Sequence, residues 1–382
     1  MKAVKQVQEQ PLSIVKSSDA TYGGYDPGSG KTTLCIETGD TTKRFTIPST
    51  IATGKLAKIA GRSKQIGAEP ASLLDDDEIA IEFDGVEYYV GRLAEEEGEN
   101  PSNAINDPRR YSGPHSQLLL FATASKLIQD DVFEIRIVTA LPASLFNEEN
   151  RLQVQQSLSR TFNYKFNGKR KKITVVVGAV VVEGAGGLAL YGDTESNTLV
   201  IDYGFRTTDI LPARGQKSIV NKCAGIQIGV GQVVQDLIDA VLSHKEYGGR
   251  RLTINQASQI LYCYANNEPL PIIKSNRRDI PVETLRGIIY ESIRTRGQQL
   301  NTQIAQALNV EGATLAAEYD IVIPIGGGAK YFRKILEEII GDTEDVEDPQ
   351  YANPDGYLDI AISMKEKVWS DVQEKIAEKR YA

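Results

Sequence analysis

The sequence predicts a mixed α/β protein of several domains, and three observations support this class. The chain has 382 residues, which at roughly 150 residues per domain is enough for about two to three domains. Strand patterns joined by turn signals dominate its first part, and strand patterns then alternate with helical ones. A nearly continuous β-branched run at 173–182 predicts a strand that is buried on both faces of a sheet.

The expected strands are short, and turn residues separate them. The Asp84-Gly85 pair between two apolar runs is the strongest short hairpin signal in the chain. The Lys-Arg-Lys-Lys run at 169–172 is expected to be a solvated turn that leads into the next strand. We expect strands at 34–36, 44–47, 79–83, 87–90, 133–138, 173–182, 199–201, 207–211 and 320–325.

Helices are expected where apolar residues recur with a period of about 3.6. From Val230 to Leu242 the apolar positions follow the i, i+3, i+4, i+7 pattern of an amphipathic helix. Pro281, with Glu283 in the first turn, marks the start of a longer helix. We expect helices at 118–128, 147–160, 230–242, 281–308, 329–340 and 363–382, and a surface loop at the acidic stretch 342–348.

The composition is that of an ordinary soluble globular protein. Hydrophobic residues make up 41% and charged residues 25% of the chain, and the net charge is −8. This negative balance argues against direct binding to a nucleic-acid backbone, which needs clustered Lys and Arg. Cys35, Cys223 and Cys263 lie far apart, which fits a reducing compartment and no disulfide framework. With only His115 and His244, a His-based metal site or a Ser-His-Asp triad is not expected.

No segment of the sequence has the character of a membrane span or an export signal. Residues 1–20 are polar and lack the apolar core of a signal peptide, and no apolar run reaches the length of about 18 residues that a span needs. An apolar stripe at Trp369, Val372 and Ile376 is expected to dock on its own domain rather than on a membrane. We therefore expect a cytoplasmic protein that does not bind a membrane.

One local pattern occurs twice, at 25–34 and at 201–210. Each copy is a strand that ends in Asp-x-Gly, followed by a tight turn rich in glycine or hydroxyl residues and then by another strand. Such turns present backbone amides to an anion, and a strand-end Asp can hold the water shell of Mg²⁺. The candidate catalytic and Mg²⁺-holding carboxylates are Asp26 and Asp202. The candidate phosphate-binding residues are Gly28, Ser29, Gly30, Lys31 and Thr32 in the first turn and Gly204, Thr207 and Thr208 in the second.

Glycines also mark the expected starts of two helices in the second half. Gly326, Gly327 and Gly328 lie between an expected strand and an expected helix, where they allow the helix N-terminus to approach a nucleotide. Gly225 and Gly229 precede the helix expected at 230–242. This pair is interpreted either as a border of the ribose and phosphates or as a helix start that contacts no ligand.

The order of the two Asp turns and the triple glycine resembles the actin and chaperone ATPase superfamily. Two further segments, 138–144 and 348–357, resemble segments typical of ParM-like plasmid-segregation actins. The resemblance covers roughly residues 20–358 and implies two ribonuclease H-like actin-fold domains with a nucleotide cleft between them. The sequence departs from the usual pattern at Arg206, where a small residue is commoner, and at Lys31, since the basic residue usually falls later.

The resemblance also implies a domain division, ligands and partners. It implies a flexible lead-in at 1–19, a first actin-like domain at 20–196 plus 357–382, and a second at 197–356. The implied ligands are ATP (or GTP) and Mg²⁺, and the implied activity is ATP hydrolysis coupled to polymerisation. The implied partners are further copies of the chain in a filament and a DNA-binding adaptor that links the filament to plasmid DNA. No direct contact with nucleic acid is implied.

Glu183 is the candidate for the residue that positions the attacking water. It ends the strand expected at 173–182 and precedes a glycine-rich turn, and its position matches the water-positioning residue of this superfamily. Without the resemblance, a strand-end carboxylate that faces solvent or caps the next helix is the better explanation. Asp209 lies past the second turn and is expected to matter far less for Mg²⁺-nucleotide binding than Asp202.

A P-loop is a rival interpretation of the first turn. The residues Gly30-Lys31-Thr32 match the end of the pattern G-x-x-x-x-G-K-[ST]. However, Tyr25 occupies the position of the required first glycine, and the residues after Lys31 form a β-rich segment rather than a helix. These two mismatches argue against a P-loop.

Other functions of the same fold are the alternatives to filament assembly. A small-molecule kinase needs a catalytic base that faces a second substrate. A chaperone-like clamp needs an appended peptide-binding domain. We expect none, because only one helix, at 363–382, is expected after the last motif. A membrane-associated scaffold needs a membrane-seeking terminal segment, which residues 1–20 do not provide.

Overall fold

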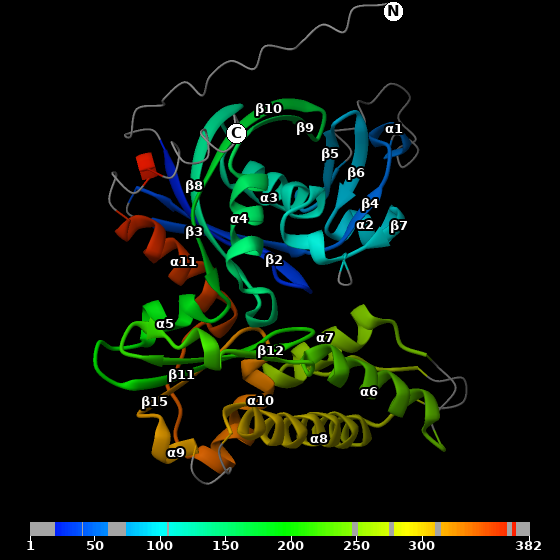
Figure 1. Cartoon of the computed structure of the whole chain (residues 1–382). Coiled ribbons are helices and arrows are strands. Elements are labelled where there is room, and N and C mark those ends of the chain that lie inside the picture. Colours follow the sequence, from blue (N-terminus) through cyan, green and yellow to red (C-terminus); the bar gives the residue numbers. More distant parts are fainter. Residues whose placement is uncertain are drawn as a thin grey trace, which may run out of the picture.

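The computed structural model describes residues 20–39, 41–59, 74–104, 107–246, 251–274, 279–309, 315–364 and 369–371. Within this part of the chain, strands form one sheet of ten strands and one of five, with helices packed against both (Figure 1). The predicted mixed α/β class is therefore confirmed. The lead-in expected at 1–19, and most of the helix expected at 363–382, lie outside the described residues.

The first sheet contains the strands of the N-terminal half. Its strands are β1 (Thr21–Asp26), β2 (Lys31–Thr38), β3 (Thr41–Pro48), β4 (Ile51–Thr53), β5 (Ile79–Phe83), β6 (Val86–Val90), β7 (Glu99–Ser102), β8 (Val132–Leu141), β9 (Thr161–Phe166) and β10 (Lys169–Val182). They follow the order β3-β2-β1-β8-β10-β9-β5-β6-β4-β7. Strands β1 and β10 both run parallel to β8, whereas the β1–β2 and β9–β10 hairpins are antiparallel.

Helices cover both faces of this sheet. They are α1 (Leu56–Ile59), α2 (Arg92–Glu97), α3 (Pro114–Leu127), α4 (Glu148–Leu158) and α11 (Ala352–Ser363). Helix α5 (Ala185–Tyr191) packs between α11 and the five-stranded sheet. The largest core of this half lies between the sheet and the buried side of α3. On the opposite face, Tyr357 and Ala361 of α11 pack with Trp369 against β8 and β10. Trp369 is fully buried, so the prediction that it docks on its own domain is confirmed, while Val372 and Ile376 lie outside the described residues.

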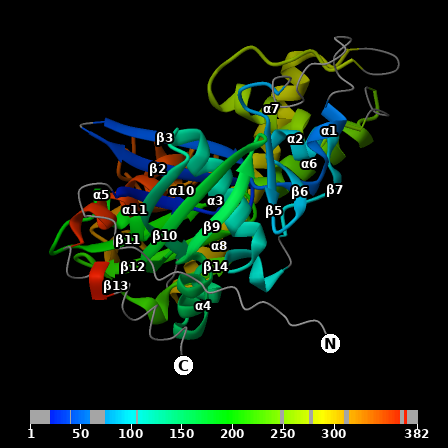
Figure 2. The same cartoon turned by 90° about the horizontal axis from the view of Figure 1, so that it is seen from above.

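The second sheet contains the strands of the C-terminal half. Its strands are β11 (Asn197–Tyr203), β12 (Thr208–Arg214), β13 (Lys217–Ser218), β14 (Ala224–Ile226) and β15 (Ile321–Ile325). Its helices are α6 (Val230–Ser243), α7 (Ile254–Ala265), α8 (Val282–Leu308), α9 (Leu315–Glu318) and α10 (Ala329–Ile340). The apolar positions of α6 face the core formed with α7, α8 and α10, as the sequence pattern predicts. Seen from above, α6 and α7 gather with β5, β6 and β7 at one end of the molecule (Figure 2).

The hairpin prediction at Asp84-Gly85 is confirmed, but the prediction for the basic run is wrong. Asp84 and Gly85 have φ angles of 49° and 78°, which is the left-handed turn that joins two strands tightly. The run at 169–172 is the first part of β10 instead of a turn. Lys171 is buried there, and its Nζ donates to the carbonyls of residues 128–130 at 2.8–3.1 Å. These carbonyls follow α3, whose C-terminal end favours a cation.

Six of the described α-helices were not expected from the sequence: α1, α2, α5, α7, α9 and α11. The segment of α11 contains Pro354 in its first turn and Gly356, which are weak helix formers. The predicted boundary between residues 356 and 357 falls inside this continuous helix, and the predicted boundary at 196/197 falls just before β11. Both boundaries stay predictions. Among the described helices, none has the length and apolar character needed to cross a membrane.

Glycines allow α11 to lie in backbone contact with its neighbours. A Cβ atom added to Gly24 of β1 would lie 1.9 Å from the carbonyl oxygen of Pro354 in α11. A Cβ atom added to Gly356 would lie 2.1 Å from the carbonyl oxygen of Gly186 in α5. Because side chains cannot fit in these spaces, glycine is required where α11 meets β1 and α5.

We expect Gly24→Ala to lower the free energy of unfolding by about 1–3 kcal/mol or more, because the methyl group forces α11 away from β1. Gly287→Ala in α8 is the matched control, since no atom lies within 4 Å of its added Cβ. The control should leave stability unchanged or raise it by up to about 1 kcal/mol. Denaturant unfolding of both variants measures the difference, and equal effects would show that the close approach of α11 is unimportant.

Candidate functional site

Four carboxylates come within electrostatic range of one another between the two sheets: Asp26, Glu183, Asp202 and Asp209. We call this group the carboxylate cluster. Asp26 ends β1 and Glu183 follows β10; both strands run parallel to β8, so their C-terminal ends lie at the same edge of the first sheet. Asp202 lies near the C-terminal end of β11, which runs parallel to β15. The cluster therefore forms where the carboxyl ends of parallel strands from both sheets meet, the usual place for ligands in α/β proteins.

Burial and mutual repulsion disfavour the charged forms of these acids. Burial raises the pKa of Asp26 to about 7, and the nearby guanidinium of Arg110 partly opposes this shift. Burial, followed by the charges of Asp26 and Asp209, raises the pKa of Asp202 to about 8. The amide Nδ2 of Asn353 opposes that shift by donating to Asp202 Oδ2 at 2.5 Å. When these acids are ionised, the cluster therefore carries more negative charge than the described part of the chain neutralises.

Glu183 and Asp209 form a hydrogen-bonded carboxyl pair. Burial, and then the charge of Asp209, raises the pKa of Glu183 well above its usual value. Asp209 also has a raised pKa because of burial, but it accepts hydrogen bonds from Ala143 N at 3.1 Å and Thr207 Oγ1 at 3.2 Å. These donors stabilise the charge on Asp209, so Glu183 is the member that carries the proton. The phenol of Tyr111 lies close by, since Glu183 contributes to its raised pKa.

The residues at the cluster fit a hydrated divalent cation. The hydroxyl of Tyr357 and the Oδ1 atom of Asn353 are buried without hydrogen-bond partners among the described residues, and the pKa of Tyr357 is raised by burial and by all four carboxylates. In this part of the chain, no three acidic, His or Cys side chains converge closely enough to bind a metal ion directly. Mg²⁺ commonly binds through one or two carboxylates and several waters. Asp26 and Asp202 could hold such an ion through water.

The first turn is held from the side of its own sheet. Ser49 Oγ donates to the carbonyl of Gly28 at 2.6 Å and shares a hydrogen bond of 2.8 Å with Thr32 Oγ1. The hydroxyl of Thr32 is therefore engaged inside the first sheet. Lys31 is exposed, and Ser29 is partly exposed. The backbone and the lysine, rather than Thr32, are the groups that this turn presents outward.

The second turn rests on the N-terminus of α6. The amides of Val230 and Gly231 donate to the carbonyls of Gly204 and Phe205 at 3.2 Å and 2.6 Å. Gly204 N in turn donates to Thr207 O at 2.9 Å, which closes the turn. The hydroxyl of Thr208 is engaged elsewhere, because it donates to Ile228 O at 2.8 Å.

The structure places the glycines predicted to bind ligand beside the second turn. Gly326 has a φ of 82°, and a Cβ atom there would lie 2.3 Å from Asp202 Oδ1. Gly328 N donates to Tyr203 O at 2.8 Å, whereas a Cβ atom on Gly327 would meet nothing within 4 Å. Gly225 pairs with Asp209 across β12 and β14, and added Cβ atoms on Gly229 and Gly30 would fall within 2.8 Å of the second turn. The glycines of the first turn, those before α6 and those before α10 thus all lie around the second turn.

Sequence reasoning missed several residues at this place. Asp209 belongs to the cluster because it pairs directly with Asp202 across β11 and β12. Paired residues of neighbouring antiparallel strands share one face, and the register of this hairpin could have shown it. The expectation that Asp209 matters far less than Asp202 for Mg²⁺-nucleotide binding stays a prediction. Arg110 reaches the cluster from a distant segment that no local pattern marks. Asn353 and Tyr357 lie in the segment 348–357, which was noted for its resemblance to ParM-like actins but not as part of the site.

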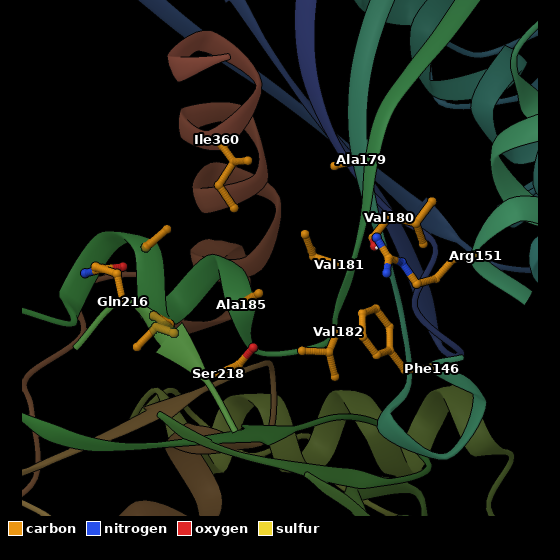
Figure 3. A pocket seen from close by; sticks show the side chains of 12 residues that line it. Phe146, Arg151, Ala179, Val180, Val181, Val182, Ala185, Gln216, Ser218 and Ile360 are labelled. Carbon is orange, nitrogen blue, oxygen red and sulfur yellow. The ribbon is translucent and has the colours of Figure 1, made fainter. Parts of the chain in front are cut away.

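A pocket of about 300 Å³ lies apart from the carboxylates, between the end of β10, α4, α5 and the β12–β13 hairpin (Figure 3). Its lining is mostly apolar and includes Phe146, Val180, Val182 and Leu188. Its one charged side chain, Arg151, is partly engaged, since its Nε donates to Val180 O at 3.1 Å. The hydroxyl of Ser218 is in the lining, but neither a carboxylate nor a histidine is there to activate it, so this pocket is not the candidate for chemistry.

Comparisons with known proteins agree with this architecture. Residues 24–186 match the family described as the N-terminal domain of actin-like proteins. The ADP complex of the archaeal actin homolog Ta0583 superposes with a TM-score of 0.67 at 20% identity, covering 90% of this chain and 100% of that one. A subunit of a 15-stranded ParM filament from Clostridium botulinum gives 0.68 at 20% identity, covering 91% and 100%. The apo form of the pSK41 ParM protein gives 0.62 at 17% identity, covering 92% and 99%. No protein with a curated description matches the chain by sequence.

These likenesses confirm the predicted fold class, which is that of two-domain actin-like proteins. The predicted resemblance to ParM-like actins is also confirmed as a resemblance in fold. Roles of individual residues do not follow from the likeness, and they are argued from the geometry of the carboxylate cluster.

Without nucleotide or divalent cation, we expect the protein to lose stability as the pH rises from 5 to 8. The folded-state pKa values of Asp26, about 7, and Asp202, about 8, lie above the ordinary value of about 3.9. The folded state therefore binds more protons than the unfolded state in this range, and the free energy of unfolding falls as these protons leave. Denaturant unfolding at both pH values measures the change, with Asp202→Asn as control. A rise in stability toward pH 8, or an unchanged slope in the variant, would contradict the assignment.

Proposed function

We propose that this chain, whose fold is that of ParM-like actins, is a nucleotide hydrolase that assembles into filaments when ATP is bound. The observation that carries the proposal is the carboxylate cluster, placed where the two Asp turns and the triple glycine meet. Its excess negative charge suits a nucleotide that arrives with Mg²⁺. The solved complex of Ta0583 with ADP supports nucleotide as the ligand.

The geometry supports distinct roles for the turns and the acids. Asp26 and Asp202 would hold Mg²⁺ through water, and the ion would supply positive charge to the phosphates. Backbone amides of the turns at Gly28–Gly30 and at Phe205–Thr207 would bind phosphate oxygens. Gly327, whose added Cβ would meet nothing within 4 Å, would border the nucleoside before α10, beside Gly326.

Glu183 and Asp209 would together position the attacking water. In the ligand-free protein Glu183 carries the proton of the pair and Asp209 the charge, as the donors to Asp209 require. A carboxyl pair of this kind can accept a proton once Glu183 becomes ionised, and its raised pKa makes it a better base than an exposed glutamate. The proposed catalytic residue is therefore Glu183, with Asp209 holding it in place.

Self-assembly is the further part of the proposal. It is supported by the likeness to the ParM filament from Clostridium botulinum. A DNA-binding adaptor that links such filaments to plasmid DNA in the cytoplasm completes the proposed function, with the division into residues 20–196 plus 357–382 and 197–356 as the two moving parts.

We expect the wild-type protein with ATP and Mg²⁺ to scatter light as it assembles and to lose that signal as phosphate is released. Glu183→Gln should assemble to the same level but keep its signal, because water positioning is lost while the amides and Mg²⁺-holding acids stay. Loss of a positioned base typically slows the reaction by about 10² to 10⁴. The measurement pairs phosphate release with light scattering in one reaction.

Electron microscopy of the same samples identifies filaments as the cause of the scattering. Asp359→Asn on α11, outside the cluster, is the matched control and should behave as the wild type. Filaments without ATP, or no assembly of the wild type at tens of micromolar, a concentration that reveals micromolar association, would refute the filament proposal. Phosphate release by Glu183→Gln within about threefold of the wild type would refute its catalytic role.

A further inference from the structure

We propose that Arg110 is a positioning residue that orients the first turn for phosphate binding. Its guanidinium binds the carbonyl oxygens of Pro27 and Gly28 and so directs the N–H groups of Gly28 and Ser29 toward the ligand. The inference rests on the proposed function, since it assumes that a nucleotide phosphate lies at this turn.

Arg110 is buried in an unusual way for an arginine. Its side chain is 3% exposed, although arginines are almost never fully buried unless they are paired. Its hydrogen bonds within the described residues go to backbone carbonyls instead of a carboxylate. Nη2 donates to Pro27 O at 3.0 Å and to Gly28 O at 2.5 Å, and Nη1 donates to Asn103 O. Its charge acts on Asp26, whose pKa it lowers against the effect of burial.

The short helix at Pro108–Tyr111 puts this side chain in place. Asp107 precedes this helix, and its Oδ1 accepts a hydrogen bond from Arg109 N at 2.9 Å, which caps the N-terminus of the helix. Arg109 then points outward with a side chain that is 77% exposed. Consecutive arginines thus face in different directions, one to solvent and one beneath the first turn.

Peptide geometry links the two carbonyls to the amides of the turn. In a trans peptide unit the C=O and N–H bonds point in opposite directions, because the unit is planar. When Arg110 holds Pro27 O and Gly28 O, the N–H groups of Gly28 and Ser29 must point away from the guanidinium. Within the described residues, neither N–H donates to a backbone carbonyl. Both donors are therefore available to an anion, as an amide nest requires.

The second turn is held in a different way. In the repeated Asp-x-Gly pattern, Pro27 and Gly28 correspond to Tyr203 and Gly204. Backbone amides bind the carbonyls of the second turn, since Gly328 N donates to Tyr203 O at 2.8 Å and Val230 N donates to Gly204 O at 3.2 Å. In the first turn the planar fork of Arg110 binds both carbonyls, and Ser49 Oγ also donates to Gly28 O. Arg110 thus binds in the first turn the two carbonyls that backbone amides bind in the second, although Gly204 N, unlike Gly28 N, is engaged within its own turn.

The experiment compares the binding of Mg²⁺-ATP with that of adenosine, which has no phosphate. We expect Arg110→Met to weaken Mg²⁺-ATP binding about tenfold or more, the effect of losing a charge-assisted hydrogen bond, and to change adenosine binding less than about twofold. The affinity of Arg110→Lys for Mg²⁺-ATP should lie between those of Arg110→Met and the wild type, because an ammonium keeps the charge but not the planar fork. Arg109→Met is the matched control and should bind both ligands as the wild type does.

Calorimetric titration measures the binding, and thermal unfolding shows that each variant is folded. A mere loss of stability would weaken the binding of adenosine and of Mg²⁺-ATP equally, and equal weakening would overturn the inference. If Arg110→Met does not fold, Arg110→Lys provides the same comparison. Unchanged Mg²⁺-ATP affinity in a folded Arg110 variant would also overturn it while leaving the proposed function intact. If the wild type itself binds no Mg²⁺-ATP, the proposed function fails and the inference fails with it.

Discussion

Repulsion among four carboxylates is the constraint on which this structure depends. Asp26, Glu183, Asp202 and Asp209 meet where the two sheets face each other, and only the guanidinium of Arg110 offsets their charge among the cations that affect their pKa values. Without a ligand, such a cluster is stable only if it retains protons. In the proposed complex a divalent cation would give these carboxylates a partner of opposite charge. The proposed ligand would then complete the site at the point where the two sheets meet.

The backbone packs closely around the cluster. Glycine lets α11 touch β1 and α5 without side chains between them, and it lets the turn before α10 approach Asp202. Helix α11 supplies the Oδ1 atom of Asn353 and the hydroxyl of Tyr357, which are buried without hydrogen-bond partners among the described residues. Helix α11 therefore both packs against its neighbours and supplies polar groups to the site. Burying polar groups without hydrogen-bond partners destabilises the fold at this place.

Most of the fold could be predicted because it follows from local requirements. The strand and helix periods of β5, β6, α6 and α10 are visible in their own residues, as are the glycines of the two Asp turns. Helix α11 was not predicted because Pro354 and Gly356 are weak helix formers. Both lie where α11 contacts the backbone of segments distant in sequence. The place of Asp209 beside Asp202 depends on strand register rather than on the motif of the turn. Arg110 contacts Gly28, which lies 82 residues away, so no local pattern could reveal that pair.

The most direct measurement of the central claim is the position of a divalent cation bound together with nucleotide. A crystal of the protein with Mn²⁺ and ADP, examined by anomalous scattering, locates the metal without reference to any assumed role. We expect one strong anomalous peak for Mn²⁺ within about 4–5 Å of the carboxylates of Asp26 and Asp202, which is the distance of a contact through water. A peak elsewhere, or nucleotide bound away from the two Asp turns, would contradict it.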